Sequence, residues 1–194
     1  MRSLLVALFL PAACSAGLFS IGAIVGTPLT DVTQTTTING INYLKNSDLY
    51  TFGPTLQVNL PAGFRVEADA LYRPIAYQIA TSASSSSNVS ASQFRFPIML
   101  QHHLGKFPIV KPYAEAGLAF DHIYNIAQAA SLLPSQPGAI VKTTNAGLVL
   151  GIGLDVKVPF VRISPEFRYT RQFSDSFQGI SELNQAEFLV GFRF

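Results

Sequence analysis

Charged residues recur at every second position in several segments of this chain. In Phe64–Arg73 (FRVEADALYR), the residues Arg65, Glu67, Asp69 and Arg73 alternate with apolar residues. Because successive side chains of a strand point to opposite faces, this spacing places the four charges on one face. Such a face could hold arginine–carboxylate ion pairs, or it could line a path for small solutes.

The same alternation assigns thirteen charged residues to the polar faces of predicted strands: Arg65, Glu67, Asp69, Arg73, Arg95, Glu115, Asp121, Asp155, Arg162, Glu166, Arg168, Glu187 and Arg193. Six arginines and seven carboxylates nearly cancel, and every base in the set is arginine. Arginine suits bidentate pairing in a confined space, whereas a surface facing water could equally use lysine. The five lysines fall in predicted loops, turns or strand ends. We therefore expect a lumen charge network that fills the interior of a barrel.

The histidines are the residues that could bind a metal or act as a catalytic base. His102 and His103 are adjacent and could bind a metal only from one face, but neighbours in a strand point to opposite faces. His122 follows Asp121 directly, so these two side chains also point to opposite faces of their strand. We therefore interpret the histidines as ordinary residues near strand ends, and the sequence predicts no metal site and no cofactor.

Two glycines could be mistaken for a phosphate-binding loop. No helical pattern follows Gly151-Ile152-Gly153, and apolar residues alternate through Ala146–Ile152 on one strand face. Both glycines lie on the opposite face, where the absence of a side chain leaves room for arginine. We therefore interpret them as lumen-facing strand residues.

Alternation of period two dominates the sequence and predicts eight strands. They are Leu18–Gly26, Leu49–Leu60, Phe64–Tyr77, Ala91–His102, Pro112–Tyr124, Thr143–Val156, Phe160–Gln172 and Gln185–Phe194. Most are longer than the five or six residues of ordinary strands, whereas a tilted strand that crosses a bilayer needs about 9–11 residues.

The connections between these strands alternate in length. Those at 61–63, 105–111 and 157–159 are short, whereas four are long and polar: Thr27–Asp48, Gln78–Ser90, Asn125–Lys142 and Phe173–Asn184. The run Ser84–Ser87 predicts a flexible connection. Strict alternation places every long loop at one end, as in an outer-membrane barrel with short periplasmic turns and longer outside loops.

The N-terminal region predicts export. Ser3–Leu10 is a short apolar run after Arg2, and small residues follow. This pattern is typical of a secretory signal peptide, residues 1–16, cleaved after Ala16 and followed by one domain, 17–194. A lipoprotein signal with the lipid on Cys14 is the alternative. The sequence contains 48% hydrophobic and only 12% charged residues, yet no later apolar run is long enough for a transmembrane helix.

Alternation alone does not decide which face is inside, and a soluble barrel of the lipocalin kind would turn its apolar face inward. The aromatic residues of the apolar face gather toward the strand ends, and the middles carry Leu, Val, Ile and Ala. Two aromatic girdles around an aliphatic band fit the two interfaces of a bilayer. We therefore expect an all-β protein that forms an eight-stranded antiparallel up-and-down transmembrane barrel, with its apolar face toward lipid.

The stretch Leu18–Phe194 resembles the small bacterial outer-membrane β-barrel proteins of the OmpA/OmpX type, and Ser20–Asp31 (SIGAIVGTPLTD) is similar to their first strand. In such families a terminal aromatic residue, preceded by apolar residues at alternate positions, is the signal read by the barrel-assembly machinery. The matching residues here are Phe188, Val190, Phe192 and Phe194. The resemblance implies location in the bacterial outer membrane, with its lipid, lipopolysaccharide and assembly machinery as partners.

The predicted role is structural or surface-interacting, through four long extracellular loops of a monomer without enzymatic activity. A narrow channel for small or hydrophobic solutes is the alternative. A lipid-modifying enzyme is less favoured, because lipid-A deacylases of this size use His-x-Ser on one face, whereas Tyr124 stands two positions after His122. The net charge of +2 without a basic run argues against nucleic acid as a partner.

Overall fold

The computed structural model describes residues 18–33, 35–38, 41–45, 50–82, 85–105, 109–127 and 139–194. The predicted signal peptide, with Cys14 and the cleavage site after Ala16, lies outside the described residues. Within the described part of the chain, no helix is long and apolar enough to cross a membrane.

Nearly all of the described chain is extended. The elements are β1 (Phe19–Pro28), β2 (Thr36–Ile38), β3 (Ile41–Lys45), β4 (Thr51–Asn59), the single 3-10 turn η1 (Pro61–Gly63), β5 (Phe64–Asp69), β6 (Leu71–Ser82), β7 (Ser85–His103), β8 (Val110–Ala127), β9 (Thr144–Lys157), β10 (Arg162–Gln172) and β11 (Asn184–Arg193).

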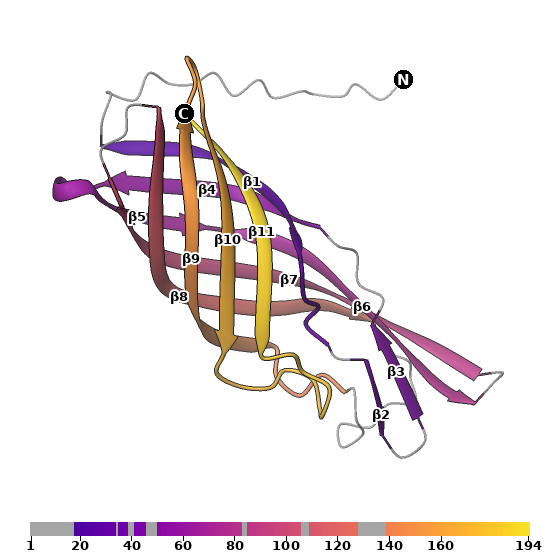
Figure 1. Cartoon of the computed structure of the whole chain (residues 1–194). Coiled ribbons are helices and arrows are strands. Elements are labelled where there is room, and N and C mark those ends of the chain that lie inside the picture. Colours follow the sequence, from indigo (N-terminus) through magenta and orange to yellow (C-terminus); the bar gives the residue numbers. More distant parts are fainter. Residues whose placement is uncertain are drawn as a thin grey trace, which may run out of the picture.

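The strands form a closed antiparallel barrel (Figure 1). β1 pairs with β11 on one side and with β4 on the other, so the first and last strands of the chain complete the wall. β5 and β6 keep one register against both neighbours and make one wall strand. With β1, β4, β7, β8, β9, β10 and β11, this gives eight wall strands and confirms the predicted fold.

The interruption between β5 and β6 has a local cause in two prolines. Ala70 donates its N–H to the carbonyl oxygen of Pro54 at 3.1 Å. Proline has no N–H to donate in return. On the other side, the register of Phe64 with His102 places Pro97 opposite Asp69, where a second donor is missing. The ladder therefore loses one bond on each side at the same level of the wall.

The two faces of the wall differ as the alternation predicts. Apolar side chains such as Leu56, Ile98 and Ile152 point outward and are 44%, 52% and 63% exposed. The charged face points inward, which excludes the lipocalin-like arrangement. Tyr50, Phe52, Tyr72, Phe94 and Tyr124 form a chain of ring contacts, with neighbouring centroids 5.1–6.1 Å apart, around the outer surface. This belt fits the interface between lipid and water.

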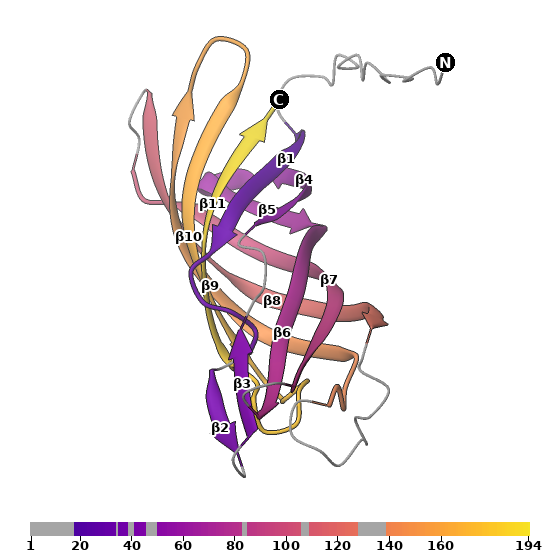
Figure 2. The ribbon, with the colours of Figure 1, turned by 90° about the vertical axis from the view of Figure 1, so that its right-hand side faces the viewer.

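The ends of the barrel are unequal (Figure 2). The β9–β10 turn and both termini of the described chain lie at one end, called here the short-turn end. The turn η1, which Figure 1 shows, belongs to the same end. The opposite, long-loop end carries β2, β3 and the β6–β7 hairpin. β3 pairs with β6 beyond the wall, so the predicted loop Thr27–Asp48 contains two additional strands.

Two other long connections also differ from the prediction. Ser85–Ser87 belong to β7 and pair with β6, so the expected flexible loop Gln78–Ser90 is mostly a continuing hairpin. The connection after β10 bends back over the barrel mouth and buries Phe177 and Ile180, which are 2% and 1% exposed. Part of the predicted loop Asn125–Lys142 lies outside the described residues.

The inward-bent connection forms an apolar plug at the long-loop end. Its buried members are Val32, Ile75, Ala91, Ile123, Phe177 and Ile180, with Ile140 packed against them. Isolated bridges between Thr33 and Ser181 and between Ile140 and Phe177 fix the backbone of these segments. The plug therefore covers the mouth with side chains from the wall and from three connections.

Candidate functional site

Arg168 of β10 lies at the centre of the lumen charge network. Its guanidinium nitrogens bind four carboxylates, with N–O distances of 2.5 Å to Glu67, 2.7 Å to Asp69, and 2.9 Å to both Glu115 and Glu166. The arginine and all four acids are buried. One guanidinium thus joins three wall strands, because its partners come from β5, β8 and its own strand β10.

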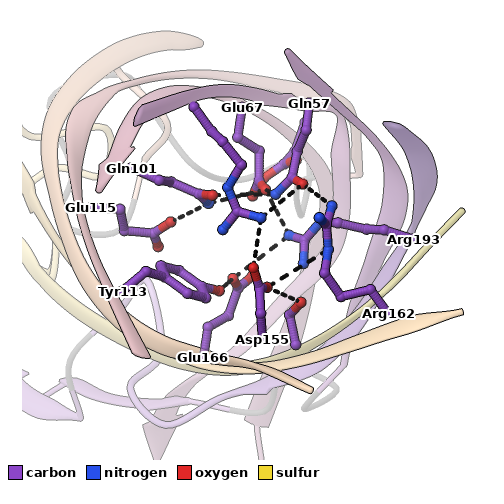
Figure 3. A network of polar contacts seen from close by, with 12 residues as sticks. Gln57, Glu67, Gln101, Tyr113, Glu115, Asp155, Arg162, Glu166 and Arg193 are labelled. Atoms are coloured by element: carbon purple, nitrogen blue, oxygen red, sulfur yellow. Dashed lines mark hydrogen bonds and ion pairs between the residues drawn. The ribbon is translucent and has the colours of Figure 1, made fainter. Parts of the chain in front are cut away.

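Neutral side chains and a second arginine complete this cluster (Figure 3). Arg193 lies 2.7 Å from Glu67, and Tyr113 donates its hydroxyl to Glu166 at 2.5 Å. Gln101 donates to Glu67 at 3.0 Å and to Glu115 at 2.8 Å. Acids that would repel one another are therefore held together by donors between them.

Asp155 organises a second group nearer the short-turn end. It lies 2.6 Å from Arg65, accepts a hydrogen bond from Ser164 at 2.7 Å, and lies 3.0 Å from Nε2 of His103. Arg162 approaches the same carboxylate at 3.8 Å and also donates to Gln57.

Arg95 organises the third group, below the apolar plug. It binds Asp121 through two nitrogens at 2.8 and 3.0 Å and Glu187 at 2.5 Å. Arg73 lies 3.7 Å from Glu187 and 3.9 Å from Asp31. The acid of one strand is again shared between arginines of others, which braces the wall across the lumen.

All thirteen predicted lumen residues point into the barrel. Twelve are buried, and Arg162 is partly exposed at the short-turn end. The structure separates them into the three groups centred on Arg168, Asp155 and Arg95. Burial of so many charges requires pairing, and every one of the thirteen has at least one ion pair.

Several members of the network were not predicted from the sequence: Gln57, Gln101, His103, Tyr113, Gln185 and Asp31. The sequence alone predicts His103 only as a residue at a strand end. Counting by twos from Arg95 along β7 reaches Gln101 and His103, so the alternation contained this signal. The neutral side chains carry no charge that would distinguish a lumen position from an ordinary polar one.

The lumen-facing glycines make room for large neighbours. A Cβ at Gly151 would overlap Glu115, and one at Gly153 would overlap the ring of Tyr113. A Cβ at Gly191 would instead overlap the guanidinium of Arg193. The predicted space-making role therefore holds, but at the two predicted positions the neighbours are an acid and a tyrosine rather than arginines.

The geometry disfavours two conventional kinds of site. Ser164 and His103 both bind Asp155, so the serine donates to the acid and is not held by the histidine as a nucleophile would be. Oxygens of Glu67, Glu115 and Glu166 lie within 4.8 Å of one another, as a metal site would require. Arg168 binds all three, which gives that space to a guanidinium.

The predicted assembly-signal residues lie on the outer face of β11. Phe188, Phe192 and Phe194 are 42%, 37% and 66% exposed, and Val190 is partly exposed. Their strand pairs with both β10 and β1. The tail is therefore a wall strand with an apolar outer surface.

Comparison with known proteins supports this architecture. Residues 12–178 match the family model described as an outer membrane protein beta-barrel domain. The fold is similar to that of Neisserial surface protein A, at 15% identity and a TM-score of 0.55, covering 90% of this chain and 95% of that protein. The N-terminal barrel of Pseudomonas aeruginosa OprF (16% identity, TM-score 0.43, covering 90% and 97%) and Ail of Yersinia pestis (12%, 0.45, 91% and 97%) also match. No curated protein matches in sequence.

Proposed function

Because the chain belongs to the outer membrane protein beta-barrel domain family, we propose that it is a closed, non-catalytic barrel that acts through its outer surface. The protein is located in the bacterial outer membrane and has a structural or surface role there. In the proposed orientation the long-loop end faces outward and the short-turn end faces the periplasm, as is usual for such barrels.

The observation that carries the proposal is the filled lumen. An eight-stranded barrel is just wide enough for side chains to fill. Here the three groups around Arg168, Asp155 and Arg95 occupy that space, and the apolar plug covers the mouth at the long-loop end. A solute would have to break several buried ion pairs to pass.

Strands that continue beyond the membrane support a surface role. β7 has 19 residues, which corresponds to about 60 Å of strand at roughly 3.3 Å per residue. At a tilt of about 40°, this strand rises roughly 45 Å, against an apolar band about 25 Å tall. β6 and β3 extend the same sheet beyond the wall, so the protein presents an ordered surface on the long-loop side.

Single-channel recording tests the closed lumen. The purified chain, reconstituted in planar bilayers, should pass little or no current. Folding of the reconstituted sample should be verified from its altered gel migration before and after boiling. A steady, well-resolved conductance from the unmutated protein would refute the closed barrel and favour the narrow channel.

The surface role needs a separate test in cells. A variant in which a short turn replaces residues 78–89 should assemble as a barrel and lose any attachment of cells that the unmutated protein confers. Equal attachment by correctly assembled variant and unmutated protein would exclude this hairpin as the interacting surface.

We also propose that the barrel is monomeric, lies among outer-membrane lipid and lipopolysaccharide, and is inserted by the barrel-assembly machinery through the apolar face of β11. The exposed side chains of Phe188, Phe192 and Phe194 support this last step.

A further inference from the structure

An open recess of about 550 Å³ lies at the short-turn end, beside the Asp155 group. Its polar lining contains Lys111, Lys157, Arg162, Arg193 and His103. Asp155 is the carboxylate among its lining residues, and it is already bound by Arg65 and Ser164. Arg193 is paired with Glu67, and Arg162 lies 3.8 Å from Asp155. Lys111 and Lys157 therefore supply the surplus positive charge of the recess, unlike the balanced network deeper in the lumen.

Two arginines that line the recess carry guanidinium N–H groups without a hydrogen-bond acceptor in the described structure. Arg193 is 1% exposed, and its Nε and Nη1 atoms lack hydrogen-bond partners. Nε of Arg162 also lacks one. A buried guanidinium N–H without an acceptor costs free energy, and an anionic oxygen is the acceptor that such groups bind most strongly. The exposed lysines Lys111 and Lys157 add positive charge and accept no hydrogen bond from the arginines.

Apart from Ser20, the remaining lining is apolar, and it borders the lipid-facing surface. Ile109, Phe160 and Phe194 are 62%, 91% and 66% exposed. A ligand that contacts both parts must combine an anionic group with hydrocarbon, which describes a phospholipid whose phosphate enters the recess. We propose that this recess binds the headgroup phosphate of an anionic phospholipid in the adjacent membrane leaflet.

Assignment of the ligand to the periplasm-facing leaflet rests on the proposed orientation. The chemistry of the recess does not, because it depends only on the charges and donors at the short-turn end. A binding experiment in detergent therefore tests the recess without testing the orientation, and surface labelling in cells tests the orientation without testing the recess.

Native mass spectrometry of the full chain in an uncharged maltoside detergent tests the proposal. Dioleoylphosphatidylglycerol should bind more tightly than dioleoylphosphatidylcholine. The double variant Lys111→Ala, Lys157→Ala should bind phosphatidylglycerol roughly ten- to thirtyfold more weakly, as expected from two basic groups near the lipid surface. Both lysines are exposed, so this variant should fold.

Lys142→Ala is the matched control, because Lys142 is an exposed lysine at the long-loop end, where it donates to Ser174. This variant should bind phosphatidylglycerol like the unmutated protein. Equal loss in both variants, no loss in the double variant, or equal binding of phosphatidylcholine would overturn the site. Inorganic phosphate that binds as tightly as the lipid, with the same sensitivity to the lysines, would overturn the lipid assignment in favour of free phosphate.

Discussion

Replacement of Arg168 by leucine would remove the cation that holds four buried carboxylates together. Glu67 retains Arg193 at 2.7 Å after the change, and Glu166 retains it at 3.7 Å. Asp69 and Glu115 have no other ion pair in the described part of the structure. Leucine fills part of the space but supplies no donor, so two acids would be left buried without a cation.

The expected cost follows from the energy of an uncompensated buried charge. Breaking one buried ion pair by removing a single partner costs about 3–5 kcal/mol. Two acids lose their cation here, but both lose the same guanidinium, and either can become neutral by taking up a proton, so the two costs do not add in full. We therefore expect Arg168→Leu to lower the free energy of unfolding by about 3–5 kcal/mol, and not by twice that amount.

Urea unfolding in lipid vesicles measures this loss. Arg171→Leu is the matched control, because Arg171 lies on the same strand with an exposed side chain that donates to Asn184. Its loss should be at most about 1 kcal/mol. Adding Glu115→Gln to Arg168→Leu should recover part of the stability, since it removes one of the orphaned charges. If the two arginine variants differ by less than about 1 kcal/mol, the lumen network does not stabilise the barrel as argued.

Three further predictions concern the ends and the tail of the barrel. A cysteine at Asp175 should react with an impermeant maleimide in intact cells, whereas one at Lys157 should react only after lysis; the opposite result would mean that the barrel is inverted. Phe177→Ala should lower the free energy of unfolding in urea by about 3–5 kcal/mol, because it opens a cavity in the apolar plug. Phe173→Ala, at a residue that is 63% exposed, should change it by about 0.5 kcal/mol or less. Similar losses in the two variants would refute the plug. Deletion of Phe194 should reduce the folded protein recovered from outer membranes on unboiled gels, and undiminished assembly would argue against the assembly signal.

The wall of the barrel could be predicted from the sequence because apolar and polar residues alternate within each strand and so define its two faces. Arg65, Glu67 and Asp69 alternate with apolar neighbours. Because lipid surrounds the barrel, the apolar side chains point outward and the charged side chains point inward, the opposite of a soluble protein. The same rule, extended to uncharged residues, also reaches Gln101 and Tyr113. Strand number therefore follows from local periodicity. The inward direction of the charges follows from the arginine–carboxylate balance and the aromatic girdles, and the end that carries the termini follows from the even strand count and the alternating connection lengths.

The long connections and the partners across the lumen could not be predicted in this way. Pairing of β3 with β6 depends on where the wall places β6, and no local period records it. Phe177 and Ile180 are isolated apolar residues in a polar segment, and only the shape of the mouth makes them a plug. Likewise, contact between Arg168 and Glu67 depends on the stagger of the closed wall. Pro54 and Pro97 interrupt a strand that alternation alone predicts as continuous.

The ion pairs of the lumen have a consequence for folding kinetics. Arg193 and Glu67 are 126 positions apart in the chain, Arg168 and Glu67 are 101 apart, and Arg95 and Glu187 are 92 apart. These residues lie across the lumen from one another, and the wall closes where β1 pairs with β11 and β4. We therefore expect these contacts to form when the barrel closes, after the main barrier to folding. Interactions absent from the transition state change the unfolding rate and leave the folding rate almost unaltered. We therefore expect the network to lower the unfolding rate, which sets how long a folded barrel persists in the membrane.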